Sequence, residues 1–299
     1  MASPVRRFGM VNDASLNELR AEIDGIDNKI QDLLIRRTEI VARIGAVKRE
    51  SESTALALRP GREAEIVRRL VARHRGPFPL RVLVHIWREI LSAQVALQSA
   101  FSVAVFAPDG ALVYRDLARA QYGSSTAMTL YRHVSQLIKA VTDGEAQVGV
   151  LPMPYGERPD PWWLGLISDG PNVPRVIAQL PFLASGDEAE ATVALAIACA
   201  EPEPTGDDTS LIGFEISEDL SRDRLRQAFR ANQLDARWIG MWHDPVANGR
   251  ALHLVAVDQF ITRDDSRLAG FRQKAGNAIQ RVRWIGAYAR PLTVADKPA

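Results

Sequence analysis

Residues 15–49 have the sequence SLNELRAEIDGIDNKIQDLLIRRTEIVARIGAVKR, and this stretch decides the fold of the N-terminal part of the chain. Ten positions in it follow one another at alternating steps of three and four residues. Such a heptad repeat is typical of one long α-helix that carries a stripe of side chains along one face. The ten positions are Leu16, Leu19, Ile23, Ile26, Ile30, Leu33, Arg37, Ile40, Ile44 and Val47.

One position of the stripe is not apolar. Nine of the ten residues are Leu, Ile or Val, and the seventh is Arg37. A guanidinium in an apolar seam is costly unless an anionic group meets it there. Two interpretations stay open from the stripe alone. Arg37 sets the register of a coiled coil or reaches out to water, or it marks a site that binds an anion.

The bulk composition excludes several classes of protein. The chain has 299 residues, of which 46% are hydrophobic and 24% charged, which is typical of a soluble globular protein of two or three domains. Because 37 Lys and Arg nearly balance 36 Asp and Glu, we expect neither a nucleic-acid partner nor a membrane partner. The first ten residues lack the apolar core of a signal peptide, and no apolar run of 18 residues occurs. A cytoplasmic location is therefore expected.

The single cysteine, Cys199, excludes a disulfide framework and a cysteine-based zinc site. It lies in the apolar run Ala-Ile-Ala-Cys-Ala, so we expect it to be a small core side chain. We expect neither a metal ion nor a cofactor.

Residues 15 to 99 are predicted to be entirely helical. Ser15 with Glu18 has the pattern of a capping box at the start of the first helix. Ser, Thr and Pro between Ser51 and Pro60 are expected to end it. Because the first helix is much longer than its two neighbours, its stripe needs a second long helix, and an intertwined homodimer is expected. The predicted helices cover residues 15–49, 62–73 and 80–98.

From Phe101 onward, short apolar strands alternate with helices, which is typical of an α/β sheet. Residues 154–174 are predicted to form a long loop, and residues 201–208 a linker. The last segment has the order βαββαβ, which predicts a ferredoxin-like fold. The expected strands are 102–108, 129–133, 148–153, 175–180, 193–199, 210–216, 236–242, 251–260 and 282–288, and the expected helices are 112–122, 134–143, 221–232 and 267–279.

Cationic and amide side chains are expected to join Arg37 in one site. Lys48, eleven residues further on, lies only about 20° from Arg37 on a helical wheel and about 16 Å along the axis. Arg20 falls about 100° away, so we expect it to serve the site of a partner subunit. Since Arg pairs with carboxylates through two hydrogen bonds, the expected ligand carries two or more carboxylates. Further candidates on the next two helices are Arg59, Arg62, Glu63, Gln94 and Gln98.

Each of these cations also has a plainer interpretation. Lys48 can favour the helix macrodipole, since it lies near the C-terminus of its helix. Arg20 can be an ordinary surface residue. The pattern of residues alone does not name a substrate.

Residues 16–98 resemble the all-helical class of chorismate mutases. The matching stretches are Leu19–Asp24, Asp27–Leu34 with Arg36 and Arg37, Gly45–Lys48, Arg59–Glu63, and Arg88–Ile90 running on to Gln98. This resemblance implies the rearrangement of chorismate to prephenate, a pericyclic reaction that requires no nucleophile and no general base. An enzyme accelerates it by holding the folded conformer and stabilising the charge that grows on the breaking ether oxygen.

The resemblance also implies roles for the candidate residues. Arg37 and Lys48 would grip the substrate within one subunit, and Arg20 would bind a carboxylate in the partner's site. Lys48 and Gln98 would donate to the ether oxygen. Glu63 would accept from the substrate hydroxyl, with Arg62 beside it.

Three departures from the family pattern concern the hydroxyl side of the site. Gln94 stands where many members have a small hydroxyl residue. Arg59 stands where a bifunctional member has an acid, and the connection 51–58 is slightly long.

The order of the parts resembles the bifunctional chorismate mutase–prephenate dehydratases, and predicts domains at 12–99, 100–205 and 209–292. Residues 101–110 and 144–152 are similar to the first lobe of the dehydratase domain. That family expects an Ile-Glu-Asn-Ser run next, where this chain has Met153-Pro154-Tyr155-Gly156, and the Thr-Arg-Phe signature is absent. We therefore expect the dehydratase activity to be lost.

The βαββαβ tail is similar to ACT domains, but their usual effector motifs are missing from it. Two interpretations stay open, a degenerate domain kept for packing or one that binds an aromatic amino-acid effector.

Together these features predict a homodimeric chorismate mutase of phenylalanine and tyrosine biosynthesis. Three alternatives stay open. The chain can keep residual prephenate dehydratase activity, or it can be a regulatory protein that binds pathway metabolites without catalysis. Since another small helical relative cleaves isochorismate, the substrate also needs a direct test.

Overall fold

The computed structural model describes residues 13–50, 57–157, 161–168, 170, 172–185, 192–216, 221–243 and 250–294. The chain divides into two compact units, residues 1–54 and residues 55–299. The first part of the connection predicted to follow the long helix, residues 51–56, lies outside the described residues. Among the described residues, no helix has the length and apolar character needed to cross a membrane.

The first unit contains the long helix α1, Asp13–Glu50, which confirms the prediction from the heptad stripe. The predicted cap is wrong, because α1 begins at Asp13 and Ser15 lies inside its first turn. Asp13 and Ala14 also adopt helical backbone, so the helix begins two residues before the serine. Leu33 and Val47 on the stripe are 67% and 65% exposed. Among the described residues of this unit, 13–50, α1 is the only element, so they contain no second helix or strand that could bury the stripe.

The second unit begins with helices α2, Pro60–Arg73, and α3, Leu80–Gln98. The bounds of α3 agree with the prediction, whereas α2 starts two residues early. Proline is well suited to the first helical position, because its missing N–H would have no partner there. The two helices pack around Ala64, Val67 and Val84, with Phe182 against them.

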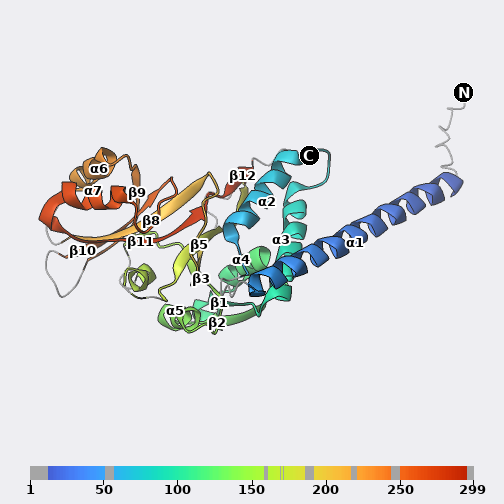
Figure 1. Ribbon diagram of the computed structural model, residues 1–299, viewed down its shortest axis with the longest axis horizontal. Helices are drawn as coiled ribbons and strands as arrows, with labels where there is room; N and C mark the ends of the chain where they lie inside the picture. The colour runs from blue at the N-terminus through green and yellow to red at the C-terminus, as the bar shows by residue number, and fades with distance from the viewer. Residues whose placement is uncertain are drawn as a thin grey trace, which may run out of the picture. The chain divides into compact units, whose positions relative to one another are not determined.

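Ten strands of the described residues form one mixed sheet in the order β2-β1-β3-β7-β5-β11-β8-β10-β9-β4 (Figure 1). Two further short strands, β6 and β12, pair with each other in a separate sheet and were not predicted. The strands of the main sheet are β1 Ser102–Phe106, β2 Ala127–Tyr131, β3 Val148–Pro152, β4 Gly156–Glu157, β5 Arg175–Leu180, β7 Ala194–Ala198, β8 Asp208–Ile216, β9 Ala236–His243, β10 Ala251–Val257 and β11 Ile279–Ala289, while β6 is Leu183–Ser185 and β12 is Leu292–Val294.

The predicted α/β segment is confirmed at one end of the sheet. Strand β1 pairs in parallel with both β2 and β3. Helix α4, Val113–Tyr122, connects β1 to β2, and helix α5, Val134–Thr142, connects β2 to β3. Successive side chains of a strand point to opposite faces. Val103 accordingly packs in one cluster with Tyr122 of α4, and Ala104 in another with Leu137 of α5.

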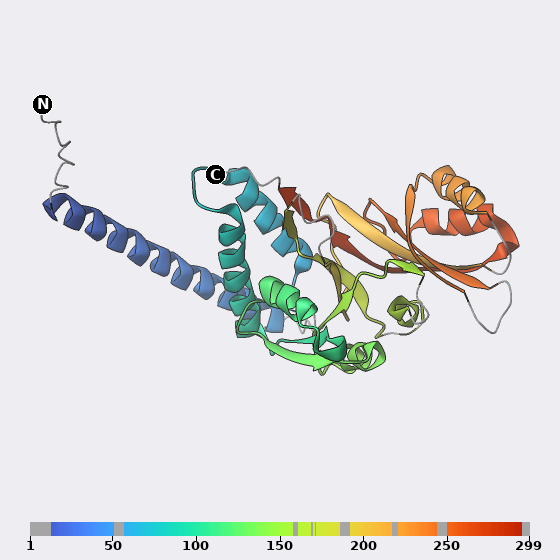
Figure 2. The same cartoon turned by 180° about the vertical axis from the view of Figure 1, so that it is seen from behind.

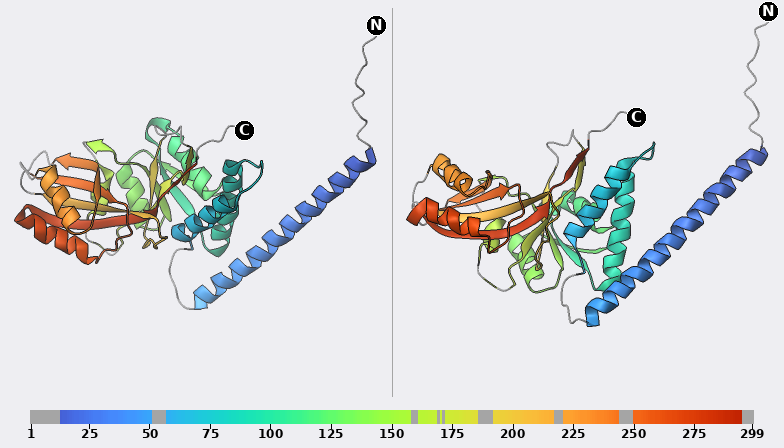
Figure 3. Two further views of the ribbon diagram at one scale, coloured as in Figure 1. Left: turned by 90° about the horizontal axis from the view of Figure 1, so that it is seen from above. Right: turned by 45° about the horizontal axis from the view of Figure 1, so that its top comes forward.

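The predicted ferredoxin-like fold is confirmed at the other end. Strands β8, β9, β10 and β11 alternate with helices α6, Arg222–Ala231, and α7, Ser266–Ala275, and pair antiparallel in the order β11-β8-β10-β9. The two helices cover one face of these strands. The view from behind (Figure 2) and two further views (Figure 3) show this arrangement. Helix α7 ends before the predicted residue 279, since Gly276 has a φ of 73° that stops the helix.

The two ends are joined where β5 meets β11, at the pair Val176 and Gly286. Gly286 has a φ of 142°, and a Cβ there would lie 2.3 Å from the Val176 carbonyl oxygen. Only glycine permits this approach. The predicted linker at 201–208 therefore connects strands of one continuous sheet.

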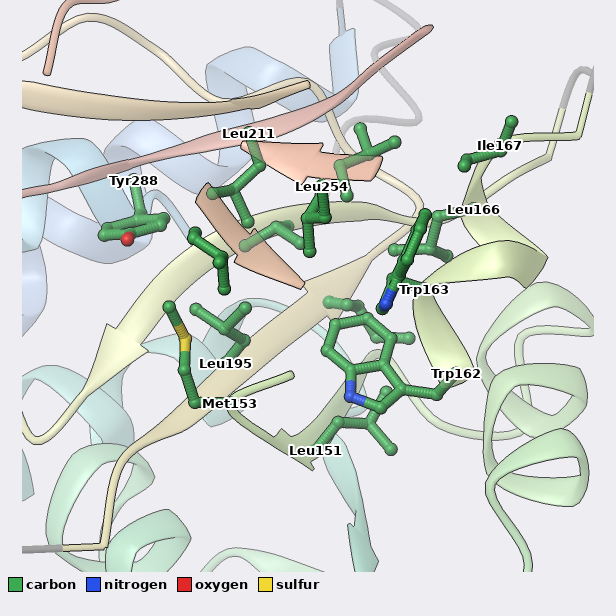
Figure 4. Packing of buried hydrophobic residues seen from close by; sticks show 14 of the residues in the cluster. Leu151, Met153, Trp162, Trp163, Leu166, Ile167, Leu195, Leu211, Leu254 and Tyr288 are labelled. Atoms are coloured by element: carbon green, nitrogen blue, oxygen red, sulfur yellow. The ribbon is translucent and has the colours of Figure 1, made fainter. Parts of the chain in front are cut away.

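The segment predicted as a long loop contains β4 and the short 3₁₀-helix η2, Trp162–Leu166. Trp162 and Trp163 are buried in one cluster with Leu151 of β3 and Leu254 of β10 (Figure 4). The Trp162 Nε1 donates to the Pro152 carbonyl oxygen at 2.9 Å. The tryptophans thus give both ends of the sheet a shared core.

Cys199 is exposed rather than part of the core, so this prediction was wrong. Strand β7 ends at Ala198, one residue before it. The apolar run therefore stops being strand before it reaches the thiol.

Candidate functional site

Three predicted site residues lie on α1, which is helical from end to end. Arg20 lies near its beginning, Arg37 near its middle and Lys48 in its last turn. Because the helix has no break between Arg37 and Lys48, the spacing that puts both on one face is retained. Arg20 is exposed, and its Nη1 donates to Asn17 Oδ1 at 3.3 Å.

Glu63, predicted to accept from a substrate hydroxyl, is buried in the second unit and paired with Arg88. The Arg88 Nη1 donates to Glu63 Oε2 at 3.0 Å, with the side chains 4% and 10% exposed. Burial raises the pKa of Glu63, while the charge and hydrogen bond of Arg88 lower it. Burial lowers the pKa of Arg88, and Glu63 opposes this shift. The two buried charges therefore compensate each other, and the ion pair holds the Glu63 carboxylate in place between α2 and α3.

Aromatic groups surround this buried pair. The Arg88 guanidinium lies 5.4 Å from the centre of the Phe182 ring. The Tyr122 hydroxyl of α4 is buried and receives no hydrogen bond from the described residues. Burial of the hydroxyl is the main cause that raises the pKa of Tyr122, and the nearby charge of Glu63 raises this pKa further. Because these side chains are largely shielded from solvent, the electrostatic attraction between Arg88 and Glu63 is stronger than it would be at the surface.

The two other predicted cations of this region have separate partners. Arg59 lies just before α2, and Arg62 lies within it. Arg59 forms a two-oxygen ion pair with Glu203, with Nη2 2.8 Å from Oε1 and 2.9 Å from Oε2. Arg62 pairs with Glu65 along the same helix at 2.8 Å. Both guanidinium groups are about half exposed. The structure does not bring either of them to the Glu63 carboxylate.

The two predicted glutamines of α3 lie one turn apart, as expected. Gln94 is buried, and the Gln98 Nε2 donates to the Gln94 carbonyl oxygen at 3.1 Å. The amide of Gln98 therefore remains near the C-terminal end of α3.

Arg88 is the residue of this cluster that the sequence-based site prediction missed. Val84, Arg88, Leu91 and Val95 follow one another at steps of four, three and four, and all are buried. This is the same signal that singled out Arg37, a guanidinium in an apolar stripe. Phe182 and Tyr122 carry no comparable signal, because they come from distant parts of the chain.

The described residues contain no group of three or more His, Cys, Asp or Glu side chains that could hold a metal ion. The chemistry available to the candidate residues is that of charge and hydrogen bonding. Cations and amide donors can bind carboxylates and oxygen atoms of a small anion.

A protein-family model described as "Chorismate mutase type II" matches residues 19–99. The match includes every predicted site residue, from Arg20 to Gln98. This part of the chain is therefore a chorismate mutase type II domain.

Two curated relatives are named bifunctional chorismate mutase/prephenate dehydratase. The protein of Aquifex aeolicus is 34% identical over 142 residues, which cover 46% of this chain and 38% of the relative. That of Pseudomonas aeruginosa is 26% identical over 147 residues, which cover 48% and 40%. The chain thus spans less than half the length of these relatives.

Among solved structures, a prephenate dehydratase of Arthrobacter aurescens in complex with L-Phe is similar to 65% of this chain. The match covers 93% of that protein, with 16% identity and a TM-score of 0.46.

Proposed function

We propose that this chain is a chorismate mutase that converts chorismate to prephenate in the synthesis of aromatic amino acids. The observation that carries the proposal is the type II mutase match over residues 19–99, which contains the interrupted stripe of α1. Arg37 and Lys48 lie on one face of that helix. Two cations so placed suit a substrate with two carboxylates.

The active form that we propose is a homodimer, in which α1 of one copy packs along α1 of the other. The nine apolar residues of the stripe meet no second helix or strand among the described residues of their own unit. A second heptad stripe is the surface that would bury them. Arg20 then acts in the partner's site. This arrangement makes the dimer a requirement for catalysis.

In the proposed mechanism, Arg37, Lys48 and the partner's Arg20 bind the carboxylates and hold the substrate in its folded conformer. Lys48 and Gln98 donate to the ether oxygen as its bond breaks, which stabilises the growing charge.

Glu63 accepts from the substrate hydroxyl in this proposal. Arg88 occupies Glu63 Oε2 and thereby orients the carboxylate, so that Oε1 can serve as the acceptor. Gln94 lies on the hydroxyl side of the proposed site, and Arg59 and Arg62 join it only if substrate draws them away from Glu203 and Glu65.

The middle region is proposed to lack dehydratase activity. Of the four residues that stand in place of the polar run, Met153 and Pro154 are buried, whereas Tyr155 and Gly156 are exposed. Met153 packs in the same cluster as Trp162 and Trp163. The two positions filled by core side chains offer no polar groups to a substrate. For the tail, we propose a packing role, with an aromatic amino-acid effector as the alternative that kinetics with phenylalanine and tyrosine would reveal.

Incubation of the purified chain with chorismate is expected to yield prephenate, which then accumulates without conversion to phenylpyruvate. Product analysis by NMR at several times measures both steps, with isochorismate as a control substrate. The mutase proposal is wrong if chorismate disappears no faster than without enzyme, or if isochorismate is the substrate consumed. Formation of phenylpyruvate at a rate proportional to enzyme concentration would contradict the proposed loss of dehydratase activity.

Mixing Arg20→Ala subunits with Arg37→Ala subunits is expected to restore activity that neither variant has alone. If each site takes Arg37 from one copy and Arg20 from the other, a heterodimer holds one intact site. Random assortment then restores roughly a quarter of the wild-type rate, because half of the dimers are mixed and half of their sites are intact. Chorismate turnover after joint unfolding and refolding is the measurement, and each variant refolded alone is the control. Absence of any gain on mixing contradicts the shared site.

A further inference from the structure

The C-terminal end of α4 is fixed against the middle of α3, its neighbour in the fold (Figure 1). Gly123, which follows α4, has a φ of 86°, and a Cβ on it would lie 2.8 Å from the Ser92 Cβ. Only glycine permits this approach. The backbone N–H of Ser124 donates to Glu89 Oε1 at 2.9 Å. Because these contacts adjoin the last residue of α4, they hold the side chain of Tyr122 at one place beside α3.

The Tyr122 hydroxyl lies within electrostatic reach of the buried Glu63–Arg88 pair. Burial is the main cause that raises its pKa, and the charge of Glu63 raises this pKa further, whereas the charge of Arg88 lowers it. The interaction is mutual, since Tyr122 is among the groups that raise the pKa of Arg88. A tyrosine whose pKa is raised keeps its proton near neutral pH, so the hydroxyl is available as a hydrogen-bond donor.

Packing alone does not explain the Tyr122 hydroxyl. Tyr122 is only 2% exposed, and its oxygen makes no hydrogen bond among the described residues. Its ring packs in one cluster with Val95 and against Phe101, contacts that a phenylalanine would make equally well. A buried hydroxyl without a partner lowers stability. Polar groups that cost stability without a structural return are typical of functional sites.

The nearby Glu63 carboxylate can accept a further hydrogen bond. Arg88 donates to Oε2. A carboxylate oxygen has two lone pairs, so Oε1 can accept from a group of the protein and from a substrate hydroxyl together. No direct hydrogen bond joins Tyr122 to this carboxylate among the described residues. One bridging water would have three polar partners there, the Tyr122 hydroxyl, Oε1 and the guanidinium of Arg88.

We propose that Tyr122 is a positioning residue of the mutase site, whose hydroxyl holds the Glu63 carboxylate in place through one bridging water. The inference rests on the proposed function, in which Glu63 accepts from the substrate hydroxyl. Tyr122 lies outside residues 19–99, which match the mutase family model. The α/β region thus supplies the site with a group that the mutase segment does not contain.

Tyr122→Phe removes only the hydroxyl and is expected to lower kcat/KM for chorismate about fivefold. A donor favours the ionised form of a carboxylate, so its loss raises the pKa of Glu63. The acid limb of the pH profile of kcat/KM should therefore move to higher pH, by about half a unit or more. Urea unfolding should give a midpoint close to that of the wild type. An unchanged pH profile, whatever the midpoint, overturns the inference.

A double variant tests whether Tyr122 acts through Glu63. Because the amide of Glu63→Gln does not titrate, adding Tyr122→Phe to it should change kcat/KM by less than about twofold. Tyr131→Phe, at a partly buried tyrosine of β2, is the matched control and should behave like the wild type. A further loss of about fivefold in the double variant contradicts the positioning role. A wild-type chain that does not convert chorismate would instead overturn the proposed function, and this inference with it.

Discussion

Replacing Arg37 by alanine is expected to lower kcat/KM for chorismate by about 10²–10³-fold, the usual cost of one donor that stabilises transition-state charge. The expectation follows from its place in the stripe of α1, where only an anionic partner would offset burial of a guanidinium. Because the reaction is pericyclic, binding and charge stabilisation are the main means of acceleration. Steady-state kinetics of chorismate consumption is the measurement.

Arg43→Ala is the matched control, since Arg43 is an exposed arginine of the same helix off the stripe and should retain wild-type kinetics. Arg37→Lys should recover only part of the rate, because an ammonium cannot form two parallel hydrogen bonds to one carboxylate. A wild-type rate in Arg37→Ala would remove Arg37 from the site. Analytical ultracentrifugation of the variant distinguishes a lost contact with substrate from a lost dimer.

Replacing Arg88 by alanine is expected to destabilise the second unit by about 3–5 kcal/mol, because the change leaves the Glu63 carboxylate buried without its partner. The ion pair is 3.0 Å long and nearly inaccessible to solvent, so water cannot replace the lost interaction. Urea unfolding followed by tryptophan fluorescence is a suitable measurement, since Trp162, Trp163 and Trp284 are buried in this unit.

Two comparisons show whether the effect comes from the unpaired charge. The double variant Glu63→Leu/Arg88→Met removes both charges and should be far closer to the wild type than Arg88→Ala. Arg226→Ala breaks the exposed helical pair with Asp223 and should cost at most about 1 kcal/mol. If Arg88→Ala unfolds at the same urea concentration as Arg226→Ala, the buried pair contributes no more to the free energy of unfolding than an exposed pair, and the prediction is wrong.

Much of the fold could be predicted because its signals are local. The stripe of α1 repeats every seven residues, and the βαββαβ order of the tail follows from alternating apolar patterns and turn residues. The errors lie where local signals are weak. Ser15 has the residue type of a cap but lies inside α1, and η2 falls in a stretch whose prolines and glycines predicted a loop.

The candidate site divides in the same way. Arg37 stood out because an arginine interrupts a repeat that surrounds it in sequence. Arg88 has an equivalent place on α3, but its significance depends on Glu63, 25 residues away. The partner of Arg59 could not be predicted either, since Glu203 is 144 residues away along the chain.

By itself, the sequence determined the long helix, the cation in its apolar stripe and the order of strands in the tail. These depend on residues within one or two helical turns or strand repeats of each other. Tertiary structure alone decided the Arg88–Glu63 pair, the contact of Phe182 with Arg88 and the joining of the sheet at Gly286. Each of these requires side chains or backbone from distant segments to meet, and the chain pattern does not specify which distant segments become neighbours.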